Sequence, residues 1–246
     1  MVKLGRATGI ILIFILGVSC SKIQPGDCFK NTGTITVESR NTPPFTNIQM
    51  NNNVDVFLTD NPNHTVEVRA GKNIIPGIKT EVSGNTLIIS NENTCNWVRN
   101  YESPIEVYLG MPQVDSIIYQ ASGNLTSMNQ FTCDSIYLNV LEGAGSIKLW
   151  VNVRISMISL QYGTADISYK GYSHISYLYS GGYGPVDLSQ MNCEYSYVTN
   201  NSLNNCKVRS NLSLEAEIHN KGDVYYSGDP AYVSSWETST GKLIKE

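Results

Sequence analysis

Apolar and polar residues recur with a period of about twenty between residues 114 and 228. Each repeat holds two signals: a serine followed by an apolar residue, and a turn triplet of a small, a polar and an apolar residue. The serine signal falls at Ser116-Ile117, Ser135-Ile136, Ser156-Met157, Ser176-Tyr177, Ser196-Tyr197 and Ser213-Leu214. The turn triplet falls at Gly123-Asn124-Leu125, Gly145-Ser146-Ile147, Ala165-Asp166-Ile167, Gly184-Pro185-Val186, Asn204-Asn205-Cys206 and Gly222-Asp223-Val224. Such a fixed period is typical of a solenoid, in which stacked units bury a shared core.

The repeats carry two adjacent apolar columns, because the two residues after each serine are mostly apolar. Neighbouring residues on a strand point to opposite faces of the sheet. We therefore expect one column to fill the solenoid, and the other to lie under the amino-terminal strands or to form an exposed apolar and aromatic stripe. Glu215 breaks the pattern in the last repeat, as a terminal unit facing water does. Backbone conformation explains the glycines and asparagines at the corners.

Shorter runs with two-residue alternation precede the repeats and predict half-buried strands. These runs are Thr34–Glu38, Val54–Leu58, Thr65–Arg69, Ile78–Val82, Thr86–Ile89 and Pro104–Leu109. The segment Ser83-Gly84-Asn85 indicates a hairpin. Because no linker-like stretch separates residues 109 and 114, we expect a single domain over residues 34–246, with amino-terminal strands (34–110) packed on the repeats (114–228). The predicted fold class is all-β: a right-handed parallel β-helix-like solenoid of about six rungs of about 20 residues each.

The first twenty residues are typical of an export signal. Lys3 and Arg6 precede a short apolar run, Ile10–Leu16, which is followed by small residues and Cys20. The run is shorter than the roughly 18 to 20 residues of a membrane span, so we expect a signal peptide over residues 1–19. The small residues before Cys20 resemble a bacterial lipoprotein box, which predicts lipid attachment at Cys20 and a lipid tether over residues 20–33. An ordinary signal peptidase site is the alternative, because Gly17 stands where the box usually has a large aliphatic residue.

Five cysteines remain after Cys20, and this odd number leaves at least one thiol free. Cys28, ahead of the first strand, and Cys95, in a loop, are the predicted disulfide. Cys133 and Cys193 are three repeats apart, which at about 4.8 Å per rung separates them by roughly 14 Å, too far for a disulfide. They are expected to be small apolar residues of the wall. No CxxC or HxxxH spacing supports a metal site, and none is predicted.

Charged residues make up 15% of the chain, with 17 Lys and Arg against 21 Asp and Glu, and the basic residues do not cluster. Nucleic-acid binding needs a basic patch, so this class of function is excluded. The 15 tyrosines and 20 glycines fit many short strands joined by turns.

Side chains able to catalyse a reaction are present but scattered. The histidines His64, His174 and His219 have no partner at a recognisable spacing. Carboxylates for glycoside hydrolysis could come from Asp115, Asp134, Glu142, Asp166, Asp187 or Asp223. However, residues come close across rungs in any solenoid, and turn aspartates usually bond their own backbone. A β-helix carbohydrate-active enzyme is therefore an alternative and not the main prediction.

Tyrosines concentrate within about two repeats, and stacked rungs would bring several into one patch. A rigid ring with a hydroxyl group is a good binding surface for sugars or proteins. Tyr177 and Tyr197 are expected to stack inside the wall as an aromatic ladder. The predicted ligand-binding residues are Tyr162, Tyr172, Tyr179 and Tyr183.

A recognisable set of segments runs through the chain. These are Phe45–Ile48, Val54–Leu58, Asn85–Ile89, Gly143–Ile147 and Gly222–Pro230. Together they resemble the putative autotransporter adhesin, head GIN domain family, over about residues 40–240. The resemblance implies a β-helix-like fold in an exported lipoprotein of a Gram-negative bacterium. It implies no established enzymatic activity and supplies no catalytic residues.

The combined prediction is a non-enzymatic exported lipoprotein, an adhesin or envelope binding module that uses a solenoid face to contact a glycan or protein. Its lipid would anchor it in the outer membrane, on the periplasmic or cell-surface side. No cofactor is predicted. A structural envelope spacer is the second alternative to the binding role.

Overall fold

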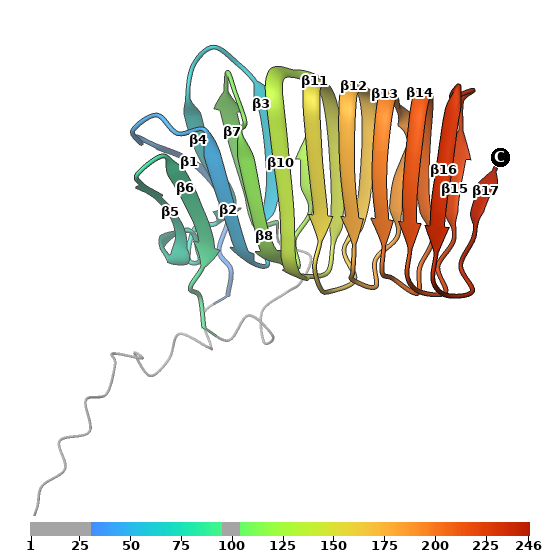
Figure 1. The fold of residues 1–246 in the computed structure, drawn as a ribbon. Coiled ribbons are helices and arrows are strands. Elements are labelled where there is room, and N and C mark those ends of the chain that lie inside the picture. Colours follow the sequence, from blue (N-terminus) through green and yellow to red (C-terminus); the bar gives the residue numbers. More distant parts are fainter. Residues whose placement is uncertain (1–30, 95–103) are drawn as a thin grey trace, which may run out of the picture.

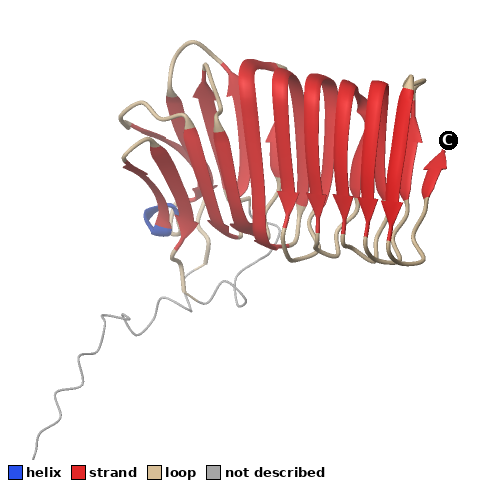
Figure 2. Cartoon of the chain, viewed as in Figure 1, coloured by secondary structure: helices blue, strands red, loops and turns tan. Residues whose placement is uncertain are grey.

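The computed structural model describes residues 31–94 and 104–246 as an elongated all-β body whose strands stack side by side (Figure 1). Its strands are β1 (Ile35–Arg40), β2 (Asn47–Asn52), β3 (Asp55–Asp60), β4 (Thr65–Gly71), β5 (Ile78–Ser83), β6 (Thr86–Asn91), β7 (Glu106–Met111), β8 (Ser116–Ala121), β9 (Leu125–Ser127), β10 (Phe131–Gly143), β11 (Ser146–Leu160), β12 (Asp166–Ser180), β13 (Val186–Asn200), β14 (Cys206–Ile218), β15 (Val224–Ser227), β16 (Tyr232–Glu237) and β17 (Leu243–Lys245). The described residues contain no α-helix, and one short 3₁₀ helix, η2 (Ile75–Gly77), lies near the amino-terminal end (Figure 2).

The body is a β-solenoid of about six turns, which confirms the predicted solenoid. The long strands β10 to β14 each contribute to two sheet faces. Their first halves form face one, where Ile147 of β11 pairs with Leu125 of β9. Their second halves form face two, where Leu138 of β10 pairs with Ile117 of β8. Face one continues through β15 and β17, and face two continues through β16.

The turn triplets set the register of face one as the sequence predicts. The apolar member of each triplet pairs in parallel with its counterpart in the neighbouring turn and is buried. This column consists of Leu125, Ile147, Ile167, Val186, Cys206 and Val224. Burying one aliphatic side chain contributes about 1.5–3 kcal/mol, so the column is a major source of stability.

The serines of face two point into the core, so the apolar columns differ from those predicted. Ser176 pairs with Ser156 and Ser196, and all three serines are buried. The residues after these three serines are therefore on the outer surface, because alternate residues of a strand face opposite ways. The core of face two is filled by the column two positions beyond the serines. This column consists of Leu138, Ile158, Leu178 and Val198.

The serine signal is also out of register at both ends of the solenoid. Ile117 pairs with Leu138, two residues beyond the expected Ile136. Leu214 pairs with Ser196 and not with Tyr197. A one-residue slip exchanges the two faces of a strand, so the serine spacing alone gives the wrong columns.

Asparagine and aspartate side chains at the corners bond the backbone of the next turn. Asp55 Oδ1 accepts the Asn124 N–H at 2.6 Å, and Asn124 Oδ1 accepts the Ser146 N–H at 3.0 Å. The same link recurs from Asn205 to Asp223 and from Asp223 to Lys242, each at 2.8 Å. Left-handed backbone is not the reason for these residues, because Asn52 is the only non-glycine residue with positive φ in the described part of the chain. We call this series of hydrogen bonds the corner ladder.

Glycine at the corners permits close stacking. A Cβ atom on Gly184 would lie 1.8 Å from the carbonyl oxygen of Ala165, and one on Gly222 would lie 2.1 Å from that of Asn204. Any larger side chain would therefore meet the backbone of the preceding turn.

The amino-terminal strands continue both faces of the solenoid. β2 pairs in parallel with β8, and β3 pairs in parallel with β9, so residues 47–60 stack on the first repeat. Beyond them, face one runs β3, β7, β4 and β1, and face two runs β2, β6 and β5. The pairing of Ser83 with Thr86 confirms the predicted hairpin.

The carboxyl-terminal end extends further than the repeats predicted from sequence. β16 pairs with β14, and β17 pairs with β15, so stacking continues past residue 228. Glu215 pairs with Ser234 of β16 and therefore does not belong to a terminal unit.

Candidate functional site

An aromatic stripe runs along the outer surface of face two. It is the column that follows the buried serines, and it consists of Tyr137, Met157, Tyr177 and Tyr197. The rings of Tyr177 and Tyr197 stack with their centroids 5.1 Å apart and 15° between their planes. Tyr177 is 45% exposed and Met157 is 39% exposed. The aromatic ladder therefore lies outside the wall, and the predicted position inside it is wrong.

A second outward column lies two residues further along each strand. It consists of Ser159, Tyr179, Thr199, Glu217 and Trp236. Two hollows, of about 260 and 210 Å³, lie along these columns and share Tyr197 and Thr199. Tyr137 lines the first hollow and Trp236 lines the second. We call the combined trough, which runs along the solenoid axis, the aromatic groove.

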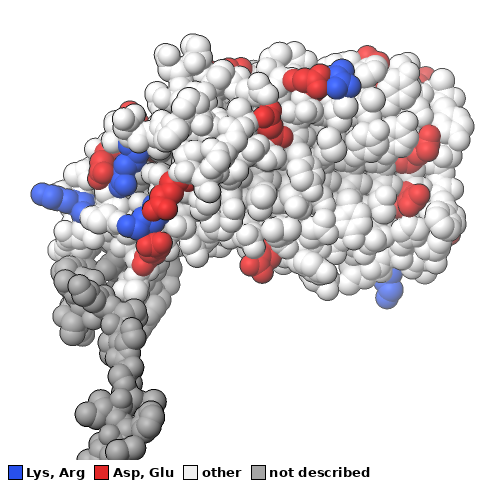
Figure 3. All heavy atoms as spheres, turned by 60° about the vertical axis from the view of Figure 1, so that its left-hand side comes forward, with Lys and Arg blue, Asp and Glu red and all other residues white. Residues whose placement is uncertain are grey.

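The middle of the aromatic groove is uncharged. The first hollow is lined by aromatic, aliphatic and hydroxyl side chains, whereas Glu215 and Glu217 line the second. Charged residues are also sparse on the face drawn in Figure 3, where they stand singly or in small groups among wide uncharged areas. Rings and hydroxyl groups without a charge can bind a ligand by stacking and hydrogen bonding.

The four predicted binding tyrosines lie in three different places. Tyr179 lines the aromatic groove. Tyr162 and Tyr183 are in corner loops and are 71% and 60% exposed. Tyr172 lies in the middle of β12 and bonds Glu194. The sequence could have identified the residues of the aromatic stripe, which line the groove with Tyr179, if the outward orientation of the column after the serines had been known.

A carboxylate and a histidine meet beside Tyr172. The Tyr172 hydroxyl donates to Glu194 Oε1 at 2.6 Å, and His174 Nδ1 lies 2.8 Å from Glu194 Oε2. The hydrogen bond from Tyr172 lowers the pKa of Glu194, and it raises the pKa of Tyr172 to about 12. A hydrolytic triad needs a nucleophile bonded to the histidine. No Ser, Thr or Cys side chain of the described residues bonds His174, so the cluster links β12 to β13 without forming a triad.

Several carboxylates considered for glycoside hydrolysis have other partners. Asp134 forms an ion pair with Arg154 at 2.7 Å, and Asp187 accepts the Ser189 N–H at 2.9 Å. Asp223 belongs to the corner ladder. Asp187 therefore bonds its own backbone, as expected for a turn aspartate, whereas Asp223 bonds the backbone of the next turn and Asp134 bonds an arginine.

The other two histidines are also in structural contacts. A ring nitrogen of His64 lies 3.0 Å from the Phe45 carbonyl oxygen, and His219 Nδ1 lies 2.9 Å from Thr238 Oγ1. Among the described residues, no group of three His, Cys, Asp or Glu side chains is placed to hold a metal ion. The same part of the chain contains no helix with the length and apolar character needed to cross a membrane.

The predicted lipid site Cys20 and the predicted disulfide partners Cys28 and Cys95 lie outside the described residues. Cys133 and Cys193 are free and three turns apart, as expected, because they pair in series through Val153 and Ser173. Burial raises the pKa of the Cys193 thiol to about 12 and that of the Cys206 thiol to about 11. Both thiols are therefore protonated near neutral pH.

The stacked turns and the outward groove define a class of protein: a β-solenoid with an extended lateral surface. A family model described as "Putative auto-transporter adhesin, head GIN domain" matches residues 44–230. The chain belongs to this family.

Solved structures share the fold at low sequence identity. A putative adhesin from Bacteroides fragilis is 15% identical, with a TM-score of 0.78 over 87% of this chain and 97% of the other. A putative adhesin from Parabacteroides distasonis is 16% identical, with a TM-score of 0.69 over 87% and 98%. A putative lipid binding protein from the same species is 14% identical, with a TM-score of 0.64 over 88% and 98%. The names of the family and of these structures mention adhesion or lipid binding and no enzymatic activity, and no curated protein matches the chain.

Proposed function

We propose that the protein is an exported, lipid-anchored adhesin or envelope binding module that holds its ligand in the aromatic groove without catalysis. Family membership supports export and adhesion, and the leader ending at Cys20 supports lipid attachment. The observation that carries the binding role is the outward aromatic stripe, in which the rings of Tyr177 and Tyr197 lie on successive turns. The solenoid core is already filled by the inward columns, so these rings are not needed to build it.

An extended, uncharged glycan is the ligand class that fits the groove best. Neighbouring turns are about 4.8 Å apart, so the groove offers similar stacking sites in series. A linear chain of sugar units can use such a series, because each sugar has an apolar face for a ring and hydroxyl groups for Ser159 and Thr199. An added peptide strand is less suitable here, since the groove floor is a sheet whose strands are already paired on both sides.

Binding to an array of neutral linear glycans tests this role. We expect Tyr177→Ala and Tyr197→Ala each to weaken binding about five- to tenfold, which corresponds to the loss of about 1 to 1.4 kcal/mol of stacking. The matched control is Phe57→Ala, because Phe57 and Tyr108 form a similar ring pair outside the groove, with centroids 4.9 Å apart and 16° between planes. Binding that survives the two groove substitutions, or that falls equally in the control, would contradict the proposal.

The same array separates the alternatives. Failure to bind any neutral glycan would favour a structural spacer. Shortened glycan chains with new reducing ends after incubation would favour a carbohydrate-active enzyme. A Tyr162→Ala, Tyr183→Ala double variant tests the corner loops, and we expect a smaller loss than for either groove variant because Tyr177 and Tyr197 line the same hollow.

The anchor and the side of the membrane need separate measurements. We expect Cys20→Ala to abolish fatty-acid incorporation during growth with a labelled fatty acid. Labelling that persists in this variant would contradict lipid attachment at Cys20. Proteolysis of intact cells then tests adhesion itself, because an adhesin must be cleaved from outside, whereas a periplasmic binding module would be protected.

A further inference from the structure

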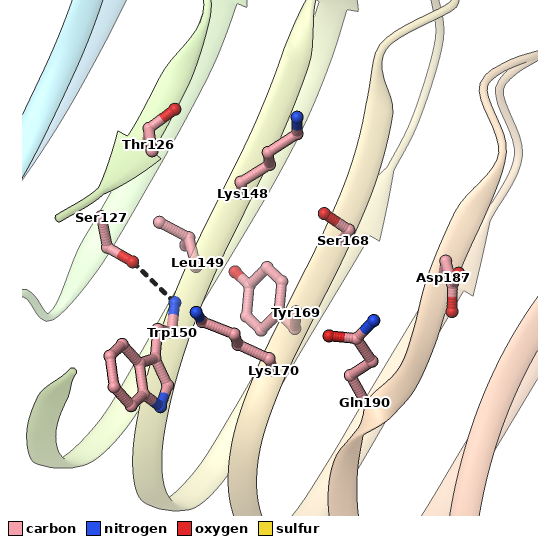
Figure 4. A pocket seen from close by; sticks show the side chains of 10 residues that line it. All are labelled: Thr126, Ser127, Lys148, Leu149, Trp150, Ser168, Tyr169, Lys170, Asp187 and Gln190. Carbon is pink, nitrogen blue, oxygen red and sulfur yellow. Dashed lines mark hydrogen bonds between the residues drawn. The ribbon is translucent and has the colours of Figure 1, made fainter. Parts of the chain in front are cut away.

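A third hollow, of about 270 Å³, lies on face one between β9, β11, β12 and β13 (Figure 4). It forms where the sheet is interrupted. β9 ends at Ser127, and β10 rejoins β11 only at Phe131, which pairs with Val151. Ser127 Oγ therefore takes the place of a strand carbonyl and accepts the Trp150 N–H at 2.6 Å.

The other side of the hollow is shaped by a β-bulge in β13. Ser168 pairs with Asp187, but Lys170 pairs with Gln190, so β13 has one extra residue between these two pairs. A bulge of this kind turns side chains away from the regular pleat and is often found beside binding sites. Here it places Gln190 and Asp187 at one end of the hollow, away from Trp150 at the other end (Figure 4).

Two lysines without a carboxylate partner give the hollow its charge. Lys148 and Lys170 both line it and are exposed, and neither forms an ion pair within the described part of the chain. Lys207, on the next turn but one of the same face, forms an ion pair with Glu246 at 2.7 Å. Lys148 and Lys170 outnumber Asp187, the one carboxylate that lines the hollow, so the hollow has a local positive charge that attracts anions.

The indole ring of Trp150 positions one of these cations. Lys170 Nζ lies 4.2 Å from the ring centroid, which is within the range of a cation–π interaction. This contact limits the motion of the ammonium group but uses none of its three N–H donors. Lys170 is therefore held at the hollow and remains able to donate to an anion.

The remaining groups suit a sugar ring that carries an acid. Thr126, Ser127 and Ser168 supply hydroxyl groups at the lysine end, and Gln190 and Asp187 can bond sugar hydroxyls at the far end. The volume is below the roughly 300–1,000 Å³ of pockets for drug-sized ligands, which favours one monosaccharide unit. A phosphate group is less well matched, because bidentate phosphate recognition favours arginine, and no arginine lines this hollow.

We propose that the hollow on face one binds the carboxylate-bearing sugar unit of an acidic glycan. The carboxylate contacts Lys170, Lys148 adds positive charge nearby, and the hydroxyl groups contact Gln190 and Asp187. Such a unit could be a uronic acid of a bacterial polysaccharide or a sialic acid of a host glycan. The site adds a ligand class to the proposed binding role and uses no residue of the aromatic groove.

Titration calorimetry with four small sugars tests the assignment. The acidic probes are methyl glucuronide and N-acetylneuraminic acid, and the comparison probes are methyl glucoside and glucose 6-phosphate. We expect at least one acidic sugar to bind at least tenfold more tightly than both comparison probes. Preference for the glucuronide would indicate a uronic-acid glycan, and preference for N-acetylneuraminic acid a sialylated one. Equal binding of methyl glucoside, tighter binding of glucose 6-phosphate, or no binding of either acidic sugar would overturn the proposal.

Variants of single lysines locate the site. We expect Lys170→Gln and Lys148→Gln each to weaken acidic-sugar binding at least fivefold, and higher salt to weaken binding to the unmodified protein. Lys207→Gln removes the same charge from the same face and should leave binding unchanged. An equal loss in this control would overturn the site assignment. Tyr177→Ala should retain acidic-sugar binding and Lys170→Gln should retain neutral-glycan binding, so failure of one proposal is distinguishable from failure of the other.

Discussion

The amino-terminal strands and the stacked turns share continuous sheets but follow different pairing rules. In the turns from β10 to β14, every strand pairs in parallel with a similar strand about twenty residues away. At the amino-terminal end, β1 pairs with β4, β4 pairs with β7 and β5 pairs with β6, all antiparallel. The repeated sequence of the turns therefore reflects repeated geometry, whereas the amino-terminal strands need no repeat.

The two regions also differ in how closely other backbone atoms approach their glycines. In the stacked turns, neighbouring corners meet so closely that side-chain size is limited, as at Gly184. At the hairpin of the amino-terminal strands, a Cβ on Gly84 would meet no atom within 4 Å. Gly184 is thus a packing requirement, whereas the glycine of the hairpin serves its backbone conformation, with φ of +60°.

The largest expected effect comes from exchanging these two glycines for alanine. We expect Gly184→Ala to prevent folding, because its methyl group would lie 1.8 Å from a backbone oxygen. Gly84→Ala should fold and lose about 1–2 kcal/mol, which is the cost of a left-handed residue with a side chain. Soluble yield and circular dichroism measure the first effect, and urea denaturation measures the second. Similar stability of the two variants would contradict the close-packed corners.

Core truncation in each region gives the next largest effect. Leu178 in the turns and Leu87 in β6 are both buried, and we expect alanine at either position to lower the free energy of unfolding by about 2–5 kcal/mol. Because sheet pairing is continuous from β6 through β2 and β8 to β10, both variants should unfold in a single transition followed by urea denaturation. A separate early transition for Leu87→Ala would show that the amino-terminal strands fold independently.

Alkaline pH should act on the stacked turns through their buried thiols. Burial raises the pKa of Cys193 and Cys206 above the ordinary thiol value, so the folded state binds more protons than the unfolded state above pH 9. Stability is therefore fully present below pH 9 and falls as pH rises through the folded pKa values near 11 and 12. The expected loss is about 1 kcal/mol per thiol for each pH unit above 9, until the folded pKa is reached.

Replacing the thiols tests that dependence. A Cys193→Ala, Cys206→Ala variant should show a shallower decline of stability between pH 9 and 11, measured by urea denaturation at each pH. An unchanged slope would assign the decline to other groups, such as Tyr119, whose pKa burial raises to about 12.

Ion pairs should give the smallest difference between the regions. Arg154 and Asp134 on the turns are both exposed, so we expect Arg154→Ala to leave the urea midpoint unchanged. Arg69 of β4 bonds Glu106, which is mostly buried and also accepts the Tyr108 hydroxyl. We expect Arg69→Ala to lower the midpoint measurably, because it leaves that carboxylate without its cation. Equal urea midpoints for the two variants would contradict the expected difference between the two ion pairs in their contribution to stability.

The turn triplets were predictable because size and polarity restrict each of their positions. The small residue meets the backbone of the preceding turn, and Ile147, Ile167 and their counterparts fill the core. The serine signal was misleading, because Ser176 is buried although it is polar, and Tyr177 is exposed although it is aromatic. Hydrophobicity alone assigns these two residues to the wrong faces.

The candidate sites depend on strand register and on local departures from the repeat, which cannot be read from the sequence. The aromatic groove requires the outward orientation of Tyr177 and its alignment with Tyr197, and both follow from strand register. The hollow on face one requires the interruption after Ser127 and the bulge beside Gln190, which are local departures from the repeat. The pairing of β1 with β4 joins segments about thirty residues apart with no repeated spacing, so alternation predicted these strands but not their order.

The corner ladder limits how such a protein can change its length. The side chains of Asp55, Asn124, Asn205 and Asp223 each accept an N–H group from the next turn, so a deletion of part of a turn beside them would misplace these donors and acceptors. Removal of a whole turn, such as residues 167–185, would instead bring Ile147 against Val186, and those residues already occupy equivalent positions. Relatives of this protein can therefore differ in reach by steps of one turn, about 4.8 Å each.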